Sequence, residues 1–209
     1  MSLNRASAET LQTLLGSEVG TLSLPLYGYP PPDVTWLKDG APLAPDSFST
    51  QYIAVEEYSG VAQLTLHNVA VSHSGTYTVT ANNTVHTNSS LVTFAISVEV
   101  FFTPVITLET TREVLEMTTD KIPCLVTSLP VASDVTWSFN GTDVEELSSS
   151  KYSMEELVHD VRGELPTSMR TLVVKQARLS DGGVYTCRAA VLITDRLHYA
   201  RKRISLSVG

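Results

Sequence analysis

The chain has 209 residues, of which 43% are hydrophobic and 17% are charged, so it carries ample material for a packed core and does not have the composition of a disordered segment. Fourteen basic and twenty-two acidic residues leave a formal net charge of −8, the wrong sign for binding a nucleic-acid backbone. The longest apolar runs are far shorter than the roughly 20 residues that a membrane-spanning helix needs.

The predicted elements are short β-strands. Apolar residues alternate with polar ones at Leu22, Leu24 and Leu26, a period of two that predicts a half-buried strand. Clusters of Gly, Pro, Asn, Asp and Ser separate the runs, and many short strands with polar turns are typical of a β-sandwich. The segment 154–160 is either one helical turn or a loop. Further strands are predicted at 34–37, 61–66, 77–80, 91–100, 134–139, 170–174, 184–190 and 203–208.

The sequence contains an internal repeat. The motif Asp-Val-Thr-Trp occurs twice, ending at Trp36 and at Trp137. A Gly-x-Tyr motif follows in each copy, at Tyr77 and at Tyr185, 41 and 48 residues after the tryptophan. Two copies of one pattern indicate two similar modules in tandem with almost no linker. The predicted modules are residues 1–100 and 101–209.

These motifs resemble the immunoglobulin superfamily over nearly the whole chain. The resemblance implies an all-β protein made of two tandem immunoglobulin-like β-sandwiches, with each tryptophan between the sheets and each tyrosine hydroxyl bonded back to the chain before the sixth strand. In the second module, Cys124 and Cys187 occupy the positions of the inter-sheet disulfide. Their spacing of 63 residues suits one long-range bridge in an oxidising compartment and argues against a zinc or redox site.

The first module has no cysteine. Counting from its Trp and Tyr places Leu24 and Val79 at the two cysteine positions, so we expect aliphatic packing in place of the bridge. His73 stands where the turn before the tyrosine usually carries aspartate. This module resembles the cysteine-lacking fourth immunoglobulin domain of receptor tyrosine kinases of the vascular endothelial growth factor and platelet-derived growth factor receptor type.

Three Asn-x-Ser/Thr sequons, at Asn82, Asn88 and Asn140, lie in predicted turns or edge segments. Chance accounts for about one sequon in a couple of hundred residues. Three of them favour the secretory route, and we expect N-glycans at these asparagines.

No catalytic motif is found. The sequence has no Gly-x-Ser-x-Gly elbow, no His-Glu-x-x-His pair and no phosphate-binding glycine loop. Its five histidines are scattered without metal-ligand spacing. We therefore expect no enzyme activity, no cofactor and no metal site.

Basic residues gather near the last predicted strand, and an apolar run at 190–193 precedes them. If that run forms the exposed turn between the last two strands, its tip would contact a partner; otherwise it belongs to the core. The basic residues form either a contact for an acidic protein face or a sulfated glycan, or strand-edge charges that discourage edge pairing. The candidate partner-binding residues are Leu192, Ile193, Arg196, His198, Arg201, Lys202 and Arg203.

These observations favour a non-catalytic, extracellular binding and spacer fragment of a cell-surface immunoglobulin-superfamily receptor, a single-pass membrane protein anchored outside this sequence. Its expected partners are proteins, among them a second copy of the chain, and not nucleic acid. Two alternatives stay open: the ectodomain of a cell-adhesion molecule, and an intracellular structural scaffold of the muscle type. In a scaffold the cysteines would stay reduced and the sequons unmodified.

Overall fold

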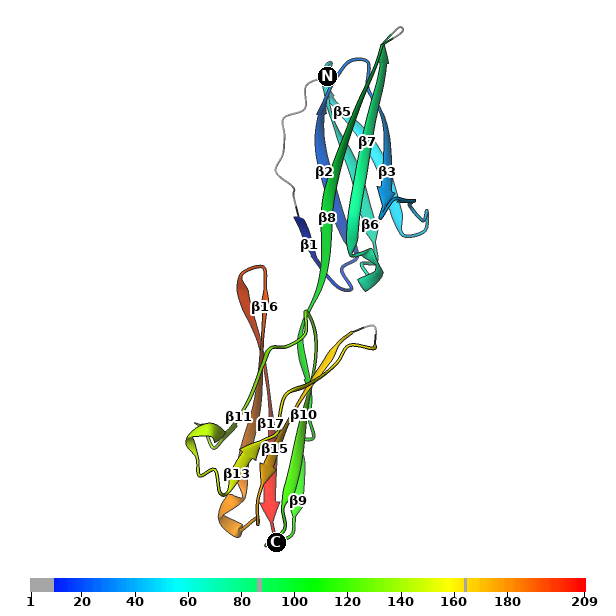
Figure 1. Ribbon diagram of the computed structural model, residues 1–209. Coiled ribbons are helices and arrows are strands. Elements are labelled where there is room, and N and C mark those ends of the chain that lie inside the picture. Colours follow the sequence, from blue (N-terminus) through cyan, green and yellow to red (C-terminus); the bar gives the residue numbers. More distant parts are fainter. Residues whose placement is uncertain (1–9, 86–87, 164) are drawn as a thin grey trace. The chain divides into compact units, whose positions relative to one another are not determined.

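The computed structural model describes residues 10–85, 88–163 and 165–209, with the backbone alone at 84–85 and 88–91. The chain divides into two compact units, residues 1–101 (unit one) and 102–209 (unit two). In the described ranges, all regular structure is β except three single-turn 3-10 helices, so the expected all-β fold is confirmed (Figure 1).

Unit one is a two-sheet sandwich. Its strands are β1 (Thr10–Leu14), β2 (Val19–Tyr27), β3 (Asp33–Lys38), β4 (Ala41–Pro42), β5 (Phe48–Glu56), β6 (Ser59–His67), β7 (Gly75–Val85) and β8 (Asn88–Thr107), of which 102–107 belong to unit two. One sheet has the order β1-β8-β7-β3-β4 and the other β2-β6-β5. β1 pairs in parallel with β8, and the other neighbours are antiparallel.

Aliphatic side chains replace a disulfide in the core of unit one. Every second residue of β2 is buried, as the period-two pattern predicts. Leu24 is 5% exposed and Val79 is fully buried, and both belong to the same buried cluster as Trp36. The two positions where immunoglobulin domains carry cysteine thus hold packed hydrocarbon.

Unit two repeats the plan. Its strands, after the end of β8, are β9 (Thr111–Val114), β10 (Asp120–Leu129), β11 (Asp134–Phe139), β12 (Thr142–Asp143), β13 (Tyr152–Met154), β14 (Val158–Asp160), β15 (Thr167–Val174), β16 (Gly183–Ile193) and β17 (Arg196–Val208). One sheet has the order β12-β11-β16-β17-β9. In the other, β10 lies between β8 and β15, and both β13 and β14 pair with β15.

The segment 154–160 is neither a helical turn nor a simple loop. It begins at the last residue of the short strand β13 and ends with the short strand β14, and both strands pair with β15. Each strand has only three residues, too few to show an alternation in the sequence, and this is why the strand signal was missed.

The core of unit two contains the disulfide between Cys124 and Cys187. Cys187 lies opposite Trp137 in the pairing of β16 with β11. The Trp137 indole is 1% exposed, and its Nε1–H donates to the carbonyl oxygen of Arg170 at 3.0 Å. Both tryptophans of the chain are therefore buried between sheets, as the repeat predicted.

Both units have the same tyrosine corner. The Tyr77 hydroxyl donates to the carbonyl of His73 at 2.8 Å, and the Tyr185 hydroxyl donates to the carbonyl of Asp181 at 2.9 Å. Both rings are fully buried. Burial raises the pKa of each phenol well above its ordinary value, so both hydroxyls stay protonated and able to donate.

His73 replaces the corner aspartate with an equivalent acceptor. In unit two, Asp181 Oδ2 accepts the backbone N–H of Arg178 at 2.7 Å. In unit one, His73 Nδ1 accepts the backbone N–H of Ala70 at 3.0 Å. Only the neutral imidazole can do this, because a protonated Nδ1 is a donor.

We expect the His73 corner to make unit one sensitive to mild acid. Burial, reinforced by the positive charge of Lys38, lowers the pKa of His73 below its ordinary 6.5. The unfolded chain then takes up the proton at a higher pH than the folded chain, so the stability that the neutral ring contributes is complete above pH 6.5 and is lost as the pH falls through the lowered pKa. Loss of such a cap costs about 0.5–2 kcal/mol. Hydrogen exchange by mass spectrometry at pH 7.5 and 5.5 would show faster opening of unit one at the lower pH.

The control for this prediction is His73→Asn. The amide oxygen accepts the same N–H and does not titrate in this range, so the pH dependence should disappear. Unit two should not change, because the pKa of Asp181 is lowered: burial raises it, but hydrogen bonds from Lys151, Tyr152 and the Arg178 N–H outweigh burial. Equal acid sensitivity in wild type and His73→Asn would contradict this explanation.

Candidate functional site

Strand alternation divides the predicted basic cluster between the two faces of β17. Arg201 and Arg203 are exposed on the outer face, together with Tyr199. His198 and Lys202 point the opposite way and are half-buried. The fifth basic candidate, Arg196, is exposed at the start of the strand beside the turn. The outer face therefore collects only part of the predicted set.

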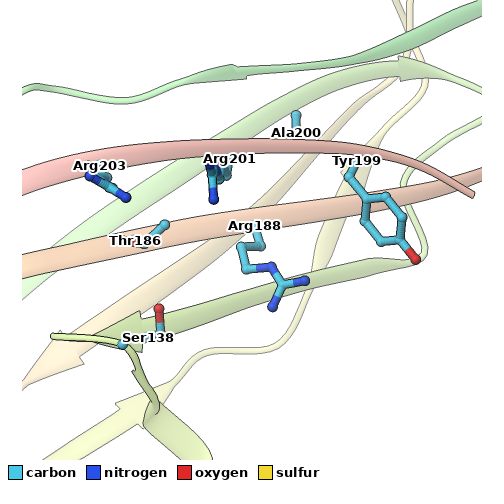
Figure 2. Close-up of a pocket in the computed structure, with 8 residues that line it drawn as sticks. Ser138, Thr186, Arg188, Tyr199, Ala200, Arg201 and Arg203 are labelled. Carbon is cyan, nitrogen blue, oxygen red and sulfur yellow. The ribbon is translucent and has the colours of Figure 1, made fainter.

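Figure 2 shows a third guanidinium on this face, that of Arg188 on β16. The hairpin register places Arg188 directly opposite Arg201, and Thr186 opposite Arg203. The sequence carries a signal for this residue, because a two-residue turn at 194–195 fixes the pairing of 188 with 201. That register was not worked out from the sequence, and Arg188 was missed.

The three arginines line an open groove of about 470 Å³ on the sheet of β11, β16 and β17 (Figure 2). Tyr199, 64% exposed, stands at one end of the row. Ser138 and Thr186 add hydroxyl groups. Ala200 and Gly141 complete the lining, so large aliphatic side chains do not contribute to it.

The groove carries uncompensated positive charge. Arg188, Arg201 and Arg203 make no ion pair with any residue in the described part of the chain. Asp134 lies on the same face by register, opposite Ala190, yet it does not pair with Arg188 within 4 Å. We call Arg188, Tyr199, Arg201, Arg203, Ser138 and Thr186 the basic groove.

The apolar run before the basic residues is not a loop tip. The turn lies at 194–195, and β16 continues through Ile193. Val191 and Ile193 face the interior, with Ile193 only 4% exposed, so the prediction that Ile193 contacts a partner is wrong. Leu192 points outward with 56% of its surface exposed, and Leu197 lies opposite it.

The sequons lie in different surroundings. Asn82 is exposed on β7, while the next residue, Asn83, is buried and donates through Nδ2 to the Pro30 carbonyl at 2.5 Å. The side chain of Asn88 lies outside the described residues. Asn140 is exposed and forms, with Gly141, the two-residue turn between β11 and β12.

Asn140 has a structural role that its sequon alone does not reveal. Its φ is +47° and that of Gly141 is +94°, a pair of left-handed residues for which Asn-Gly is favoured in a hairpin turn. Asn140 Oδ1 also accepts the backbone N–H of Val184 at 3.0 Å. Asp39 and Gly40 form the same turn in unit one, so this asparagine belongs to the fold whether or not it carries a glycan.

A second surface, on the other sheet of unit two, was not predicted. Leu125 and Met169 are cross-strand neighbours and are each 37% exposed, and Val158, opposite Met169, is 54% exposed. Leu125 and Met169 line an apolar depression of about 280 Å³. Alternation along the strands places these side chains on the outer face of the sheet. Apolar residues at outward positions were the sequence signal that could have predicted this surface.

Two further properties concern the described part of the chain, candidate metal ligands and candidate membrane-spanning helices. No group of three or more His, Cys, Asp and Glu side chains is placed to hold a metal ion there. None of the helices described has the length and apolar character required to cross a bilayer.

Two sandwiches that each bury one tryptophan and close one tyrosine corner have the architecture of immunoglobulin domains. Residues 9–96 match the immunoglobulin I-set domain family, and residues 103–190 match a further immunoglobulin domain family. The chain therefore consists of two tandem immunoglobulin domains.

Its relatives include both muscle and adhesion proteins. The chain is 29% identical over 173 residues to the muscle M-line assembly protein unc-89 of Caenorhabditis elegans, covering 83% of the chain and 2% of that protein. It is 26% identical over 174 residues to neural cell adhesion molecule 1-A of Xenopus laevis, covering 83% and 14%. An I-band fragment of titin is similar in structure, with a TM-score of 0.58 and 25% identity over 95% of the chain and 62% of the fragment. The chain thus spans a small part of these curated relatives.

Proposed function

We propose that the chain is a non-catalytic binding and spacer part of an extracellular immunoglobulin-superfamily receptor, in which two rigid sandwiches present sheet faces to protein partners. The observation that carries the extracellular assignment is the disulfide between Cys124 and Cys187. Disulfides persist in oxidising compartments and are rare in the cytosol. Exposed sequons at Asn82 and Asn140 support the same compartment.

Protein binding is supported by the exposed apolar row on unit two. Leu125 and Met169 are each 37% exposed and Val158 is 54% exposed, on neighbouring strands of one sheet. Contiguous exposed apolar surface is a mark of interaction sites, and a few buried anchors supply most of the binding energy. The row contains no ionisable group and offers no chemistry for catalysis.

A second candidate function is a structural role in an intracellular scaffold. Similarity to unc-89 and to titin favours it, and unit one, which has no cysteine, is folded without any disulfide. In that setting Cys124 and Cys187 would be reduced. The adhesion role is supported by similarity to neural cell adhesion molecule 1-A.

The compartment is tested by expressing the chain behind a secretion signal and also in the cytosol of the same eukaryotic cells. We expect only the secreted protein to lose mass on enzymatic deglycosylation and to yield one disulfide-linked peptide pair containing Cys124 and Cys187. The variants Asn82→Gln and Asn140→Gln identify the modified positions. A secreted protein with unmodified asparagines and two free thiols would overturn the extracellular assignment and favour the scaffold.

Partner binding is tested by changing the apolar row. Met169→Glu and Leu125→Lys are expected to abolish capture of a protein partner or self-association measured by sedimentation, because a buried unpaired charge opposes docking. Thr127→Lys, on the same outward side of β10, is the control. Equal behaviour of all three variants would remove this row from the proposal.

A further inference from the structure

The geometry points to a sulfated glycosaminoglycan as the ligand of the basic groove, with Arg188, Arg201 and Arg203 binding its sulfate groups and Tyr199 lying against a sugar ring. This inference rests on the proposed extracellular function, because such polymers lie on and between cells. It assigns a ligand to a different face of unit two from the apolar row.

The first argument is the placement of like charges. Arg188 and Arg201 are direct cross-strand partners, and Arg203 follows Arg201 on the same face at about 6.6 Å, two strand residues further. Like charges directly opposite each other destabilise a sheet. No described acidic side chain neutralises them. The sheet thus holds three cations close together and at an unfavourable spacing, which a bound polyanion would relieve.

The second argument is that the fold does not require these charges. The same positions in unit one, counted from the corner tyrosine and through the β7–β8 register, are Thr80, Thr93 and Ala95. Thr80 faces Thr93 as Arg188 faces Arg201. The two sandwiches share this architecture, so the arginines are an addition specific to unit two.

The lining of the groove favours a glycan over an acidic protein. A protein interface buries its anchors at its centre, whereas Tyr199, the one ring of the basic groove, stands at the end of the row and is 64% exposed, and no large aliphatic side chain lines the groove. Guanidinium groups bind oxyanions through two parallel N–H bonds, and the Ser138 and Thr186 hydroxyls can bond sugar hydroxyls. Tyr199 offers an exposed ring with a polar tip. An open, polar groove suits a hydrated linear polymer.

The length of the groove favours a polymer over a single small anion. From Tyr199 to Arg203 the strand advances about 13 Å, and Arg201 and Arg203 are about 6.6 Å apart within it, a separation suited to two successive anionic groups of one chain. A single free sulfate ion would contact only some of the three guanidinium groups. We therefore expect inorganic sulfate to bind far more weakly than a sulfated chain.

The test is binding of the purified, intact chain to immobilised heparin at physiological salt. Arg188→Gln, Arg201→Gln and Arg203→Gln together should weaken binding at least about tenfold, because each substitution removes a charge-assisted contact. The matched control, Lys121→Gln, Arg162→Gln and Arg178→Gln, removes three exposed basic residues of the same unit and should bind as the wild type does. Affinity of the wild type should fall as salt rises, with a shallower dependence in the groove variant.

Further probes distinguish the sources of the anionic charge. Replacing the three groove residues by lysine keeps the charge and removes the planar fork, so binding should be intermediate. Desulfated heparin and poly-glutamate should both bind poorly. Poly-glutamate binding as tight as heparin binding would overturn the glycan in favour of an acidic protein, and a groove variant that binds heparin like the wild type would overturn the site.

The folding of the groove variant is measured alongside. Its thermal midpoint should stay the same or rise, because the variant relieves the opposition of Arg188 and Arg201. The result of the heparin test is separable from the result of the test of the proposed function. Free thiols together with heparin binding through the groove would overturn the extracellular assignment only. A disulfide-bonded, glycosylated chain whose groove does not bind heparin would overturn this inference only.

Discussion

Replacing Cys124 and Cys187 together by alanine should lower the free energy of unfolding of unit two by about 4 kcal/mol, the chain-entropy value for a bridge that closes a loop of 63 residues. Most domains are stable by only about 5–15 kcal/mol, so unit two would lose a large fraction of its stability. The loss falls at the centre of the core, where Cys187 lies opposite Trp137.

Hydrogen exchange by mass spectrometry resolves this effect by unit in the intact chain. Peptides from 102–209 should lose most of their protection in the double variant, while peptides from 10–85 should keep theirs. Exposed Ser205→Ala on β17 is the control for an ordinary substitution in the same sheet and should change neither unit. Unchanged protection in unit two would mean that the bridge is dispensable and that our description of its core is wrong.

Leu24→Ala should destabilise unit one by about 2–5 kcal/mol, the usual range for removing a buried leucine and leaving a cavity. The effect should be large here because Leu24 occupies a cysteine position beside Trp36 and Val79, and no covalent link can limit the opening of the two sheets. An outward residue on the same strand provides a matched control, since Thr21→Ala should cost less than about 0.5 kcal/mol.

Denaturant titration, monitored by hydrogen exchange in peptides of unit one, measures the difference in free energy of unfolding between these two variants. A leucine that fills the place of a disulfide should also be rescued by restoring sulfur. Leu24→Cys with Val79→Cys should recover part or all of the loss under oxidising conditions, and reductant should abolish the recovery. If Leu24→Ala destabilises unit one no more than Thr21→Ala does, the packing of Leu24 against Val79 does not replace the disulfide.

The features predicted well from the sequence depend on local pattern and on a repeat. Period two along β2 identified Leu24 as inward-facing, and the spacing from Trp to Tyr located both cores. These features are robust because burial forces alternate residues to one side of a strand. The buried Trp36 and Trp137 follow from the same rule.

The basic groove was only partly predictable, because it depends on pairing between strands. Arg201 and Arg203 were named from their closeness in sequence, which also drew in Lys202 and His198 from the other face. Arg188 is 13 residues before Arg201 and becomes its neighbour only through the hairpin register. Surfaces assembled across strands need the register before their members can be named.

His73 illustrates a substitution whose meaning depends on three-dimensional contact. The sequence showed only that the usual aspartate is absent, whereas in the structure the imidazole accepts the same type of N–H and the corner tyrosine keeps its hydrogen bond. The change exchanges a carboxylate for an imidazole, whose lowered pKa keeps Nδ1 an acceptor until the pH falls through it. Sequence identifies the position, and only the contacts show that the function of the corner is retained.

The two units share one fold, whose two sheets are linked by a disulfide in unit two and held by aliphatic packing alone in unit one. The fluorescence of the two tryptophans reports on this difference directly. In Trp36→Phe the remaining indole, Trp137, follows unit two; in Trp137→Phe, Trp36 follows unit one. Denaturant unfolding of both variants by fluorescence, with and without reductant, should show a lower midpoint for Trp137 in reductant and an unchanged midpoint for Trp36. Midpoints that both shift, or that both stay fixed, would contradict the account.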